Sequence, residues 1–465
     1  MSGGSLSIAL SGLDAAQTGL DTVSENISNA NTPGYLKETA SFANQQTPGD
    51  PIGNGVTVTG ILQSSNSFNR QLELSANGSQ SYANQMQSLL TSAQASFNEP
   101  SSNGIAEQMN TMFNDFSNVA DTPSQPAAYL QLQASAQNVA TAIHQAAANL
   151  TATYNQASTA ATTLVGTINS QLQQVASINT QLASTSLTPG ASNTLVDQQN
   201  QVIDKLASEL GVTSIPGHAG QTTLLIGGVA LVQGGQASQI TFTPGSGLAT
   251  GSTTGDATVT LASSGTSVPV SSGTLGATLA ALNSNLPKYM NSLNQLASSL
   301  VVRVNNSTSN GGSSTTGLTT PLFGYGQGAS FSAPTTPTTS AQVNASTFMV
   351  NPQFASSYLA SGTSSLAGDG TTFQQIANLQ TATTGPTGEW ATSVAQAGLD
   401  VQNATANATN ATNVYNQAYS AEQSVSGVSV NSQLVNLVNY QQQYQAAAKV
   451  ISTVAATLQS LIQDV

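Results

Sequence analysis

Both ends of this 465-residue chain carry regular heptad patterns. Apolar residues recur every seven positions in one row near the N-terminus and in two rows near the C-terminus, which is the spacing of amphipathic helices that pack on a partner. This spacing predicts helices over residues 5–30 and 431–464. The N-terminal row is Leu6, Leu13, Leu20 and Ile27; the C-terminal rows are Leu437, Tyr444, Ile451, Leu458 and Val465, and Tyr440, Ala447, Val454 and Leu461.

The C-terminal helix is not expected to be stable by itself. Ordering its backbone and side chains costs more conformational entropy than its apolar rows can offset by burial. Two interpretations remain open. The ends could pack together within one molecule as an ordinary helical bundle, or they could also pack against other subunits as the inner wall of a tube whose middle faces outward. The entropy comparison favours other subunits.

Between the ends, the patterns predict a mainly α fold. This fold is a discontinuous helical bundle or coiled coil formed by the N- and C-terminal regions, with a small β-rich insertion domain. Gly, Thr, Val and Ser and repeated turn pairs mark that insertion, and Pro287 should interrupt a long helix over 275–305. The predicted domains are a terminal coiled-coil assembly domain (1–70 and 421–465), a helical body (71–211 and 273–420) and the outer insertion (212–272). Within the body, helices are expected at 71–97, 104–120, 127–183, 195–210, 373–381 and 390–425.

Charged residues make up only 5% of the chain, against about 25% in ordinary globular proteins. The six basic residues are scattered, so the sequence lacks the clustered Lys and Arg that nucleic acids or anionic lipids require. No segment approaches the ~20 apolar residues of a membrane span. We therefore predict no nucleic-acid and no membrane partner. The N-terminus also lacks the features of a conventional signal peptide, so export would leave it uncleaved.

Catalytic and metal-binding patterns are missing from the sequence. There is no cysteine, and the two histidines, His144 and His218, stand far apart. Neither belongs to a metalloprotease motif, and no glycine-rich segment has the lysine of a phosphate-binding loop. We therefore predict no cofactor, no metal and no enzymatic activity, and we assign both histidines packing or surface roles.

Two segments at opposite ends resemble the signatures of bacterial flagellar rod, hook and hook-associated proteins. The first runs from Leu20 to Tyr35, and the second combines 426–430 with 437–451. The residues that carry this motif are Asn26, Asn29, Asn31, Pro33, Gly34, Tyr35, Ser426, Gly427 and Val428. The middle narrows the resemblance to the hook-associated protein 1 family, which forms the first hook–filament junction, through segments such as 194–199, 231–234, 273–276 and 321–323.

The resemblance implies a structural subunit that lies outside the cell, in the flagellum between hook and filament, and provides the base for flagellin assembly. Its partners would be copies of itself, the hook protein, the second hook–filament junction protein and, before type III export, a flagellar export chaperone. One departure is that Asn431, Ser432 and Gln433 stand where the family commonly has acidic residues. We therefore expect amide and hydroxyl hydrogen bonds to replace salt bridges between subunits.

Other interpretations stay open. The chain could be another axial protein, such as a distal rod or hook subunit. The polar insertion over 212–272 could instead belong to a surface adhesin, and an enzyme is the last alternative.

Overall fold

The computed structural model describes residues 2–32, 34–45, 53–184, 191–248, 256–306, 318, 320–327, 330–333, 343–360 and 370–463. Its helices are α1 (Ser2–Ser28), α2 (Ser67–Ala95), α3 (Ile105–Asp121), α4 (Pro126–Leu182), α5 (Ala191–Leu210), α6 (Gly273–Ala280), α7 (Leu286–Asn306), α8 (Phe354–Ala360), α9 (Thr371–Ala377), α10 (Pro386–Ser426) and α11 (Val430–Gln463). Its strands are β1 (Glu38–Asn44), β2 (Val56–Gln63), β3 (Thr213–Pro216), β4 (Thr222–Ile226), β5 (Val229–Gln233), β6 (Gln236–Ala237), β7 (Ile240–Thr243), β8 (Thr258–Leu261), β9 (Phe323–Gln327), β10 (Ser330–Ser332) and β11 (Phe348–Val350).

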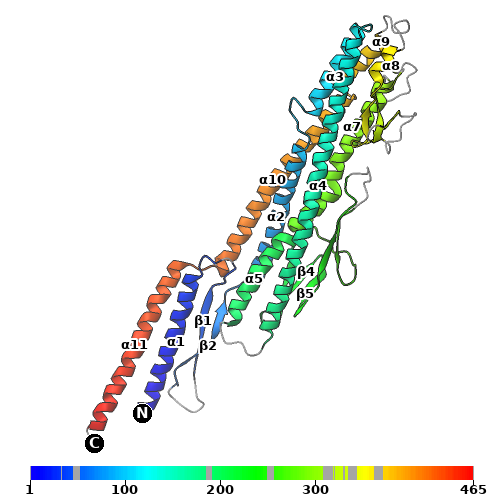
Figure 1. Cartoon of the computed structure of the whole chain (residues 1–465). Coiled ribbons are helices and arrows are strands. Elements are labelled where there is room, and N and C mark those ends of the chain that lie inside the picture. Colours follow the sequence, from blue (N-terminus) through cyan, green and yellow to red (C-terminus); the bar gives the residue numbers. More distant parts are fainter. Residues whose placement is uncertain are drawn as a thin grey trace.

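The molecule is a long rod in which segments far apart in the sequence lie side by side (Figure 1). Helix α4, 57 residues long, spans most of the helical body; α2, α5 and α7 pack beside it, and α10 packs on α2 and α7. The two chain ends lie together at one tip of the rod, where α1 and α11 run antiparallel next to the β1–β2 hairpin. This arrangement confirms the predicted mainly α fold with long terminal helices and small sheets in the middle.

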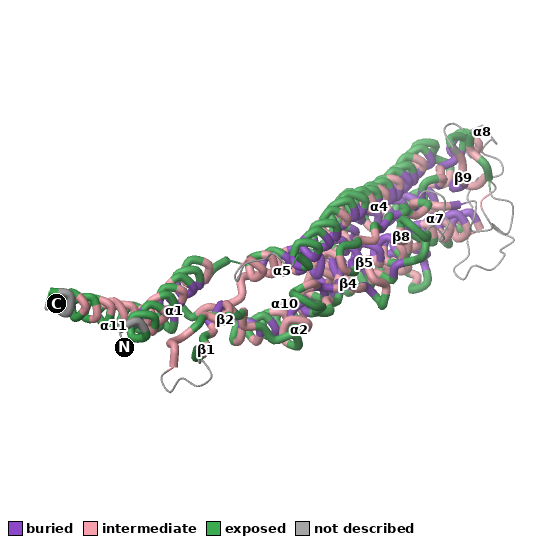
Figure 2. The backbone as a smooth tube through the Cα atoms, turned by 90° about the horizontal axis from the view of Figure 1, so that it is seen from below, coloured by how far each residue is buried: buried purple, intermediate pink, exposed green. Residues whose placement is uncertain are grey.

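The core lies in the helical body and not in the terminal pair. Buried residues line the inside of the body, whereas α1 and α11 are mostly exposed or half-buried (Figure 2). As far as the structure describes them, α1 and α11 contribute no side chain to the main buried cluster, which is drawn from residues between Leu74 and Ala404. The body can therefore bury its apolar surface without the chain ends.

Local sequence explains where the long helices begin. Pro126 opens α4 and Pro386 opens α10, the first-turn position at which the missing proline N–H costs nothing. The side chain of Asn66 accepts hydrogen bonds from the backbone N–H groups of Phe68 and Asn69 and so caps α2. Pro287 interrupts its helix as expected. Because Pro287 has no N–H to donate, the chain widens into a π-helical turn, Ala281–Asn285, directly before it.

The β insertion consists of a four-stranded antiparallel sheet in the order β3-β4-β5-β6 and a β7–β8 hairpin. Both lie along α4, as Figure 1 shows for β4 and β5. A further small sheet, β10-β9-β11, lies near α7 and α4. Where it is described, the segment over 306–375 contains these three strands and helix α8, and Phe323, Phe348 and Phe354 bury their rings in the body.

Buried and half-buried asparagines attach these extended segments to the helices. Each of five asparagine side chains bonds both the N–H and the C=O of one residue in an extended segment, at 2.7–3.1 Å; we call this arrangement an amide clamp. The clamps are Asn26–Glu38, Asn169–Ile240, Asn179–Thr222, Asn283–Ala257 and Asn305–Phe323. They use neutral amides where other proteins use charges, in agreement with the low charge content.

Glu99 joins two distant helices of the body. One carboxylate oxygen accepts hydrogen bonds from the backbone N–H of Ala106 in α3, at 2.8 Å, and from the indole N–H of Trp390 in α10, at 3.0 Å. We expect Glu99→Ala to lower the free energy of unfolding by about 1.5–3 kcal/mol, since both donors lose a charged partner. Chemical denaturation followed by the fluorescence of Trp390, the chain's single tryptophan, measures this effect. Glu107→Ala, at an exposed position of α3, should change stability much less.

Candidate assembly site at the paired termini

Small residues on α1 permit its close approach to α11. Ala9, Ala16 and Val23 are spaced by seven and buried, and Gly19 lies against the ring of Tyr440. A Cβ atom at Gly19 would lie 2.6 Å from the Tyr440 ring, so only glycine fits there without movement. The Tyr440 ring also meets Phe42 of β1 edge to face, with ring centroids 6.3 Å apart. Tyr440 therefore joins α11 to both α1 and the hairpin.

Within one molecule, the predicted heptad rows are only partly covered. Leu6 is 39% exposed, and Leu13, Leu20 and Ile27 are half-buried. The described members of the C-terminal rows named as assembly residues, namely Leu437, Tyr440, Tyr444, Ile451, Val454 and Leu458, are all half-buried. The side chain of Leu461 lies outside the described residues. An assembly role for these rows stays a prediction, and the uncovered apolar area leaves room for further contacts.

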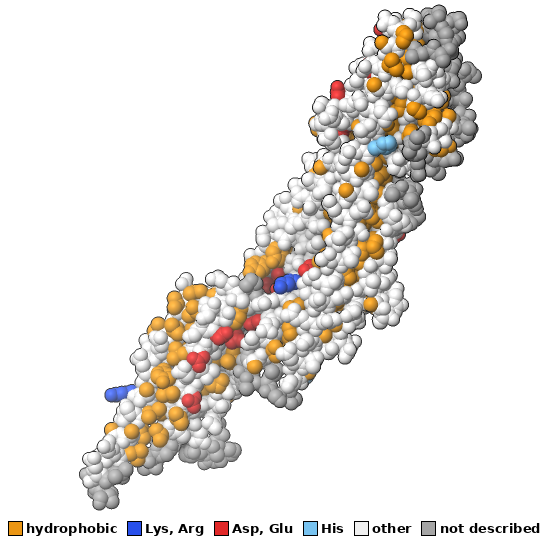
Figure 3. Space-filling model, viewed as in Figure 1, with side chains coloured by type: hydrophobic (Ala, Val, Ile, Leu, Met, Phe, Trp, Pro, Cys, Tyr) orange, Lys and Arg blue, Asp and Glu red, His pale blue; other side chains and the backbone are white. Residues whose placement is uncertain are grey.

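Sequence periodicity did not single out a second apolar face. Leu10 of α1 and Val430, Leu434, Val435, Val438 and Val450 of α11 are between 42% and 62% exposed. Figure 3 shows hydrophobic side chains gathered over this end of the rod. Because soluble monomers rarely expose contiguous apolar patches, such a surface marks a site of association. Valines at 435 and 438 could have been noticed, but they fall outside both seven-residue rows.

Asn26 is the centre of the N-terminal signature. Besides clamping Glu38, its side chain accepts a hydrogen bond from the Tyr35 hydroxyl at 3.1 Å and donates to Gln433 of α11 at 3.4 Å. Asn26 is 1% exposed. One side chain thus connects α1, the loop that follows it, β1 and α11. The contact with Gln433 is a hydrogen bond between two side-chain amides.

The loop after α1 packs on the helical body. Gly34 has a φ of 78°, and a Cβ atom there would lie 2.9 Å from Gln201 of α5. The side chain of Asn29, the residue after α1, hydrogen-bonds the carbonyl and the carboxylate of Glu25 in the last turn of the helix. Asn31 is exposed. Burial raises the pKa of the half-buried Tyr35, and the nearby acidic groups add to the effect. Pro33 lies outside the described residues.

The C-terminal signature forms the turn between α10 and α11. The backbone N–H of Lys37 donates to the carbonyl of Ser426 at 2.8 Å, and the Lys37 ammonium approaches the carbonyl of Val425 at 3.4 Å. Gly427 ends α10 and donates to the Gln423 carbonyl, against which a side chain at 427 would collide. Val428 is half-buried beside it. The structure therefore brings both signatures together at one joint.

The same joint contains an open groove of about 680 Å³ between α1, β1 and the α10–α11 turn. Its walls are mostly polar. Lys37, Glu38 and Gln433 line it together with Gly19 and Tyr440. Burial raises the pKa of Glu38.

Other chemistry is missing from the described part of the chain. No group of three acidic or histidine side chains could hold a metal ion there, and none of the helices is long and apolar enough to cross a membrane. A ring nitrogen of His144 hydrogen-bonds the carbonyl of Phe348 at 2.9 Å, while His218 is exposed in a turn. What the geometry supports is packing between helices.

A glycine pair on α1 offers a matched test of this packing. We expect Gly19→Leu to loosen the packing of α1 on α11, because overpacking against Tyr440 costs about 1–3 kcal/mol. Gly12→Leu should be tolerated far better, since no atom of this chain lies within 4 Å of a Cβ there. Hydrogen exchange of α1 in the two variants measures the loss of protection. Equal losses from the two variants would contradict a specific α1–α11 contact.

Comparisons with known proteins show which protein family has this architecture. The two ends match the models of flagellar basal body rod proteins: residues 6–35 match the N-terminal rod model, and 420–464 match the C-terminal model of the FlgEFG rod proteins. Together with the rod-shaped fold, these matches define an axial protein of the flagellum. Residues 90–323, half of the chain, match the helical domain of the flagellar hook-associated protein FlgK. The chain belongs to the FlgK family of flagellar hook-associated proteins.

Individual relatives agree with this family. The chain is 29% identical to flagellar hook-associated protein 1 of Salmonella typhimurium over 299 residues, which are 62% of this chain and 53% of that protein. The values for the Escherichia coli protein are 29% over 302 residues, 62% and 54%. The chain thus spans about half the length of these curated relatives. The flagellar hook protein FlgE of Salmonella typhimurium is 49% identical, but over only 59 residues, 13% of this chain and 14% of that protein.

A solved structure shares the fold. The flagellar hook junction protein FlgK from Burkholderia pseudomallei superposes with a TM-score of 0.61 at 17% identity, covering 77% of this chain and all of that one. At this identity the likeness concerns the fold alone. It confirms the long helical body with small sheets that the sequence predicted.

Proposed function

We propose that this chain is a structural subunit of the bacterial flagellum that joins the hook to the filament and provides the base on which flagellin assembles. The observation that carries the proposal is the combination, in one chain, of axial-protein ends with a FlgK helical domain. The likeness to the hook protein FlgE is confined to about an eighth of the chain, so it supports a shared assembly end and not a hook subunit.

Assembly would proceed through the paired termini. The partly covered heptad rows would pack against α1 and α11 of neighbouring copies, because burying apolar surface is the main favourable term in association. The exposed valines of α11 would do the same; they are Val430, Val435, Val438 and Val450. Along the axis of the flagellum, the neighbouring partners would be the second junction protein and the hook protein. A flagellar export chaperone would bind before secretion, and the N-terminus would stay uncleaved. No catalytic step is part of this proposal.

Immunogold electron microscopy of isolated flagella tests the location. Labelling confined to a short band between hook and filament is the expected result. Labelling along the whole hook would favour a hook subunit, and labelling below the hook a distal rod subunit. A screen of glycans and host proteins against residues 212–272 addresses the adhesin alternative, for which the compact docking of this insertion on α4 gives no particular support.

A further inference from the structure

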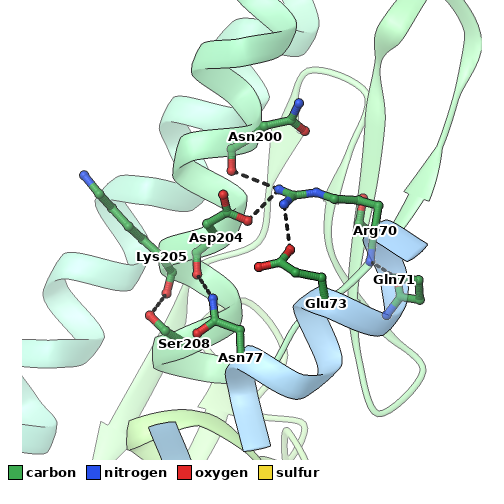
Figure 4. Close-up of polar contacts among 9 residues, drawn as sticks. Arg70, Gln71, Glu73, Asn77, Asn200, Asp204, Lys205 and Ser208 are labelled. Carbon is green, nitrogen blue, oxygen red and sulfur yellow. Dashed lines mark hydrogen bonds and ion pairs between the residues drawn. The ribbon is translucent and has the colours of Figure 1, made fainter. Parts of the chain in front are cut away.

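Where the terminal pair meets the body, α2, α5 and α10 bring together four charged side chains. Arg70 and Glu73 come from α2, Asp204 from α5 and Glu422 from the last turns of α10; we call them the joint cluster. One guanidinium nitrogen of Arg70 lies 2.8 Å from Glu73 Oε2, and the other lies 2.6 Å from Asp204 Oδ1 (Figure 4). Arg70 also donates to the carbonyl of Asn200 at 3.3 Å. The direct ion pairs of Arg70 are therefore with the first two carboxylates.

Glu422 is the member of the cluster without a direct partner. It is 4% exposed, and neither of its carboxylate oxygens, both buried, has a partner at hydrogen-bond geometry among the described residues. The nearby hydroxyl of Ser426 opposes the rise that burial causes in the pKa of this carboxyl, but it donates its hydrogen bond to the backbone carbonyl of Glu422, at 3.0 Å. Glu422 stands one turn before Ser426, the last residue of α10. The carbonyl of Ser426 accepts a hydrogen bond from the backbone N–H of Lys37. A buried carboxylate without donors is costly in its ionised form and far cheaper when it carries a proton.

The charge balance of the cluster also favours the protonated form of its carboxyl groups. Three carboxyl groups face one guanidinium, so the fully ionised cluster carries a net charge of −2 away from water. The pKa of Glu73 is raised to about 7, mainly by burial and then by the charges of Asp204 and Glu422, while Arg70 opposes this shift. Burial likewise raises the pKa values of Asp204 and Glu422.

Other titratable groups near the cluster do not restore the balance. Tyr415 of α10 faces it, but burial raises the pKa of that phenol, so it stays neutral. Lys205 of α5 points away from Arg70 in Figure 4. On the loop before β1, the ammonium of Lys37 is engaged by the carbonyl of Val425.

We propose that the joint cluster is a proton-controlled lock between the helical body and the paired termini. With protons bound, the end of α10 is held against α2 and α5. When the cluster loses them, repulsion among the three carboxylates loosens this end of α10, and the α10–α11 turn gains freedom to move. The proposal concerns this chain itself and does not depend on its place in the flagellum.

The direction of the pH effect follows from the linkage between proton binding and folding. The folded joint binds protons more tightly than the unfolded chain, in which a glutamate titrates near 4.5. The stabilisation is therefore complete below that pH and is lost as the pH rises through about 7. A second carboxyl group at the joint acts in the same direction. Asp197 of α5 is 8% exposed and accepts hydrogen bonds from Gln63 and Leu36, and burial raises its pKa to about 7, with Glu38 adding to the effect.

Hydrogen exchange of the full chain tests the lock. Protection of the amides in residues 420–427, corrected for the intrinsic pH dependence of exchange, should fall roughly tenfold to thirtyfold between pH 5.5 and pH 8.0. Amides in residues 139–150, in the middle of α4, should change much less. A joint whose protection does not change, or changes no more than that of α4, would overturn the proposal.

Amide variants separate this lock from general pH sensitivity. Glu422→Gln mimics the protonated side chain at every pH, so its joint at pH 8.0 should keep the protection that the wild type has at pH 5.5. Glu389→Gln is the control, because this carboxylate lies near the other end of the same helix and pairs with Arg303 at 2.9 Å. It should retain the full wild-type response. If Glu422→Gln does not fold, Glu73→Gln replaces it, and a variant that still shows the complete pH response refutes the lock.

Discussion

Removing residues 431–465 is expected to abolish filament growth while leaving the helical body folded. The deletion takes away α11, which packs chiefly on α1, and it leaves the core between Leu74 and Ala404 intact. Without α11, the buried face of α1 and the Tyr440 contact at Gly19 lose their partner. Contacts between subunits that depend on the paired helices cannot form, so the loss should be essentially complete.

The measurement combines motility with the state of the purified protein. A strain that expresses only the truncated chain should not swim and should show hooks without filaments. The truncated protein should keep the thermal transition of the body and the fluorescence of Trp390. Gln459→Ala with Ser460→Ala, at exposed polar positions of α11 outside the signature, serves as a control that keeps the helix and should leave motility nearly unchanged. Filament growth in the truncated strain would contradict the proposed assembly role.

Periodicity predicted the helices because it reports which side of an element is covered. The long α4 and the paired ends follow directly from apolar residues at three-, four- and seven-residue steps. Predicting contacts was harder. Ala9, Ala16 and Val23 broaden the apolar stripe of the leucines at 6, 13 and 20, and inside this chain they are the buried members of that stripe. Which members of a stripe meet the partner depends on close packing, which favours small residues against an aromatic ring and is not visible in the spacing alone.

The polar part of the architecture could not be predicted from one sequence. Asn169 and Asn283 look like ordinary surface residues of helices, because an asparagine carries no sign of whether its amide meets water or a strand. The partners lie at distant sequence positions, 71 residues away for Asn169. The same holds for the joint cluster, in which Arg70 and Glu422 are brought together only by the antiparallel packing of α2 on α10. The expectation that amides and hydroxyls replace salt bridges concerned contacts between subunits, and it stays a prediction.

Asn179 is the amide clamp whose loss should cost most. Its side chain is fully buried in α4 and makes four hydrogen bonds at 2.8–2.9 Å. It donates to the carbonyls of Thr222 and Gly234, and it accepts from the N–H of Thr222 and from Gln199. In Asn179→Ala, two carbonyls and two donors lose this partner inside the protein. Each buried polar group left without a partner costs about 1–3 kcal/mol, so we expect the free energy of unfolding to fall by about 3–5 kcal/mol.

Denaturant unfolding and hydrogen exchange of β4 and β5 measure this change. Exchange in those strands should rise more than exchange in α2 and α10, since the clamp holds the insertion on α4. Asn155→Ala, at an exposed position of the same helix, should change stability by less than about 0.5 kcal/mol. Asn179→Asp keeps the shape but removes both donors and buries a carboxyl group, so it should be at least as damaging as alanine at neutral pH and less damaging at pH 5. Such a pH dependence would show that the hydrogen bonds of the amide, and not its volume, hold the insertion in place.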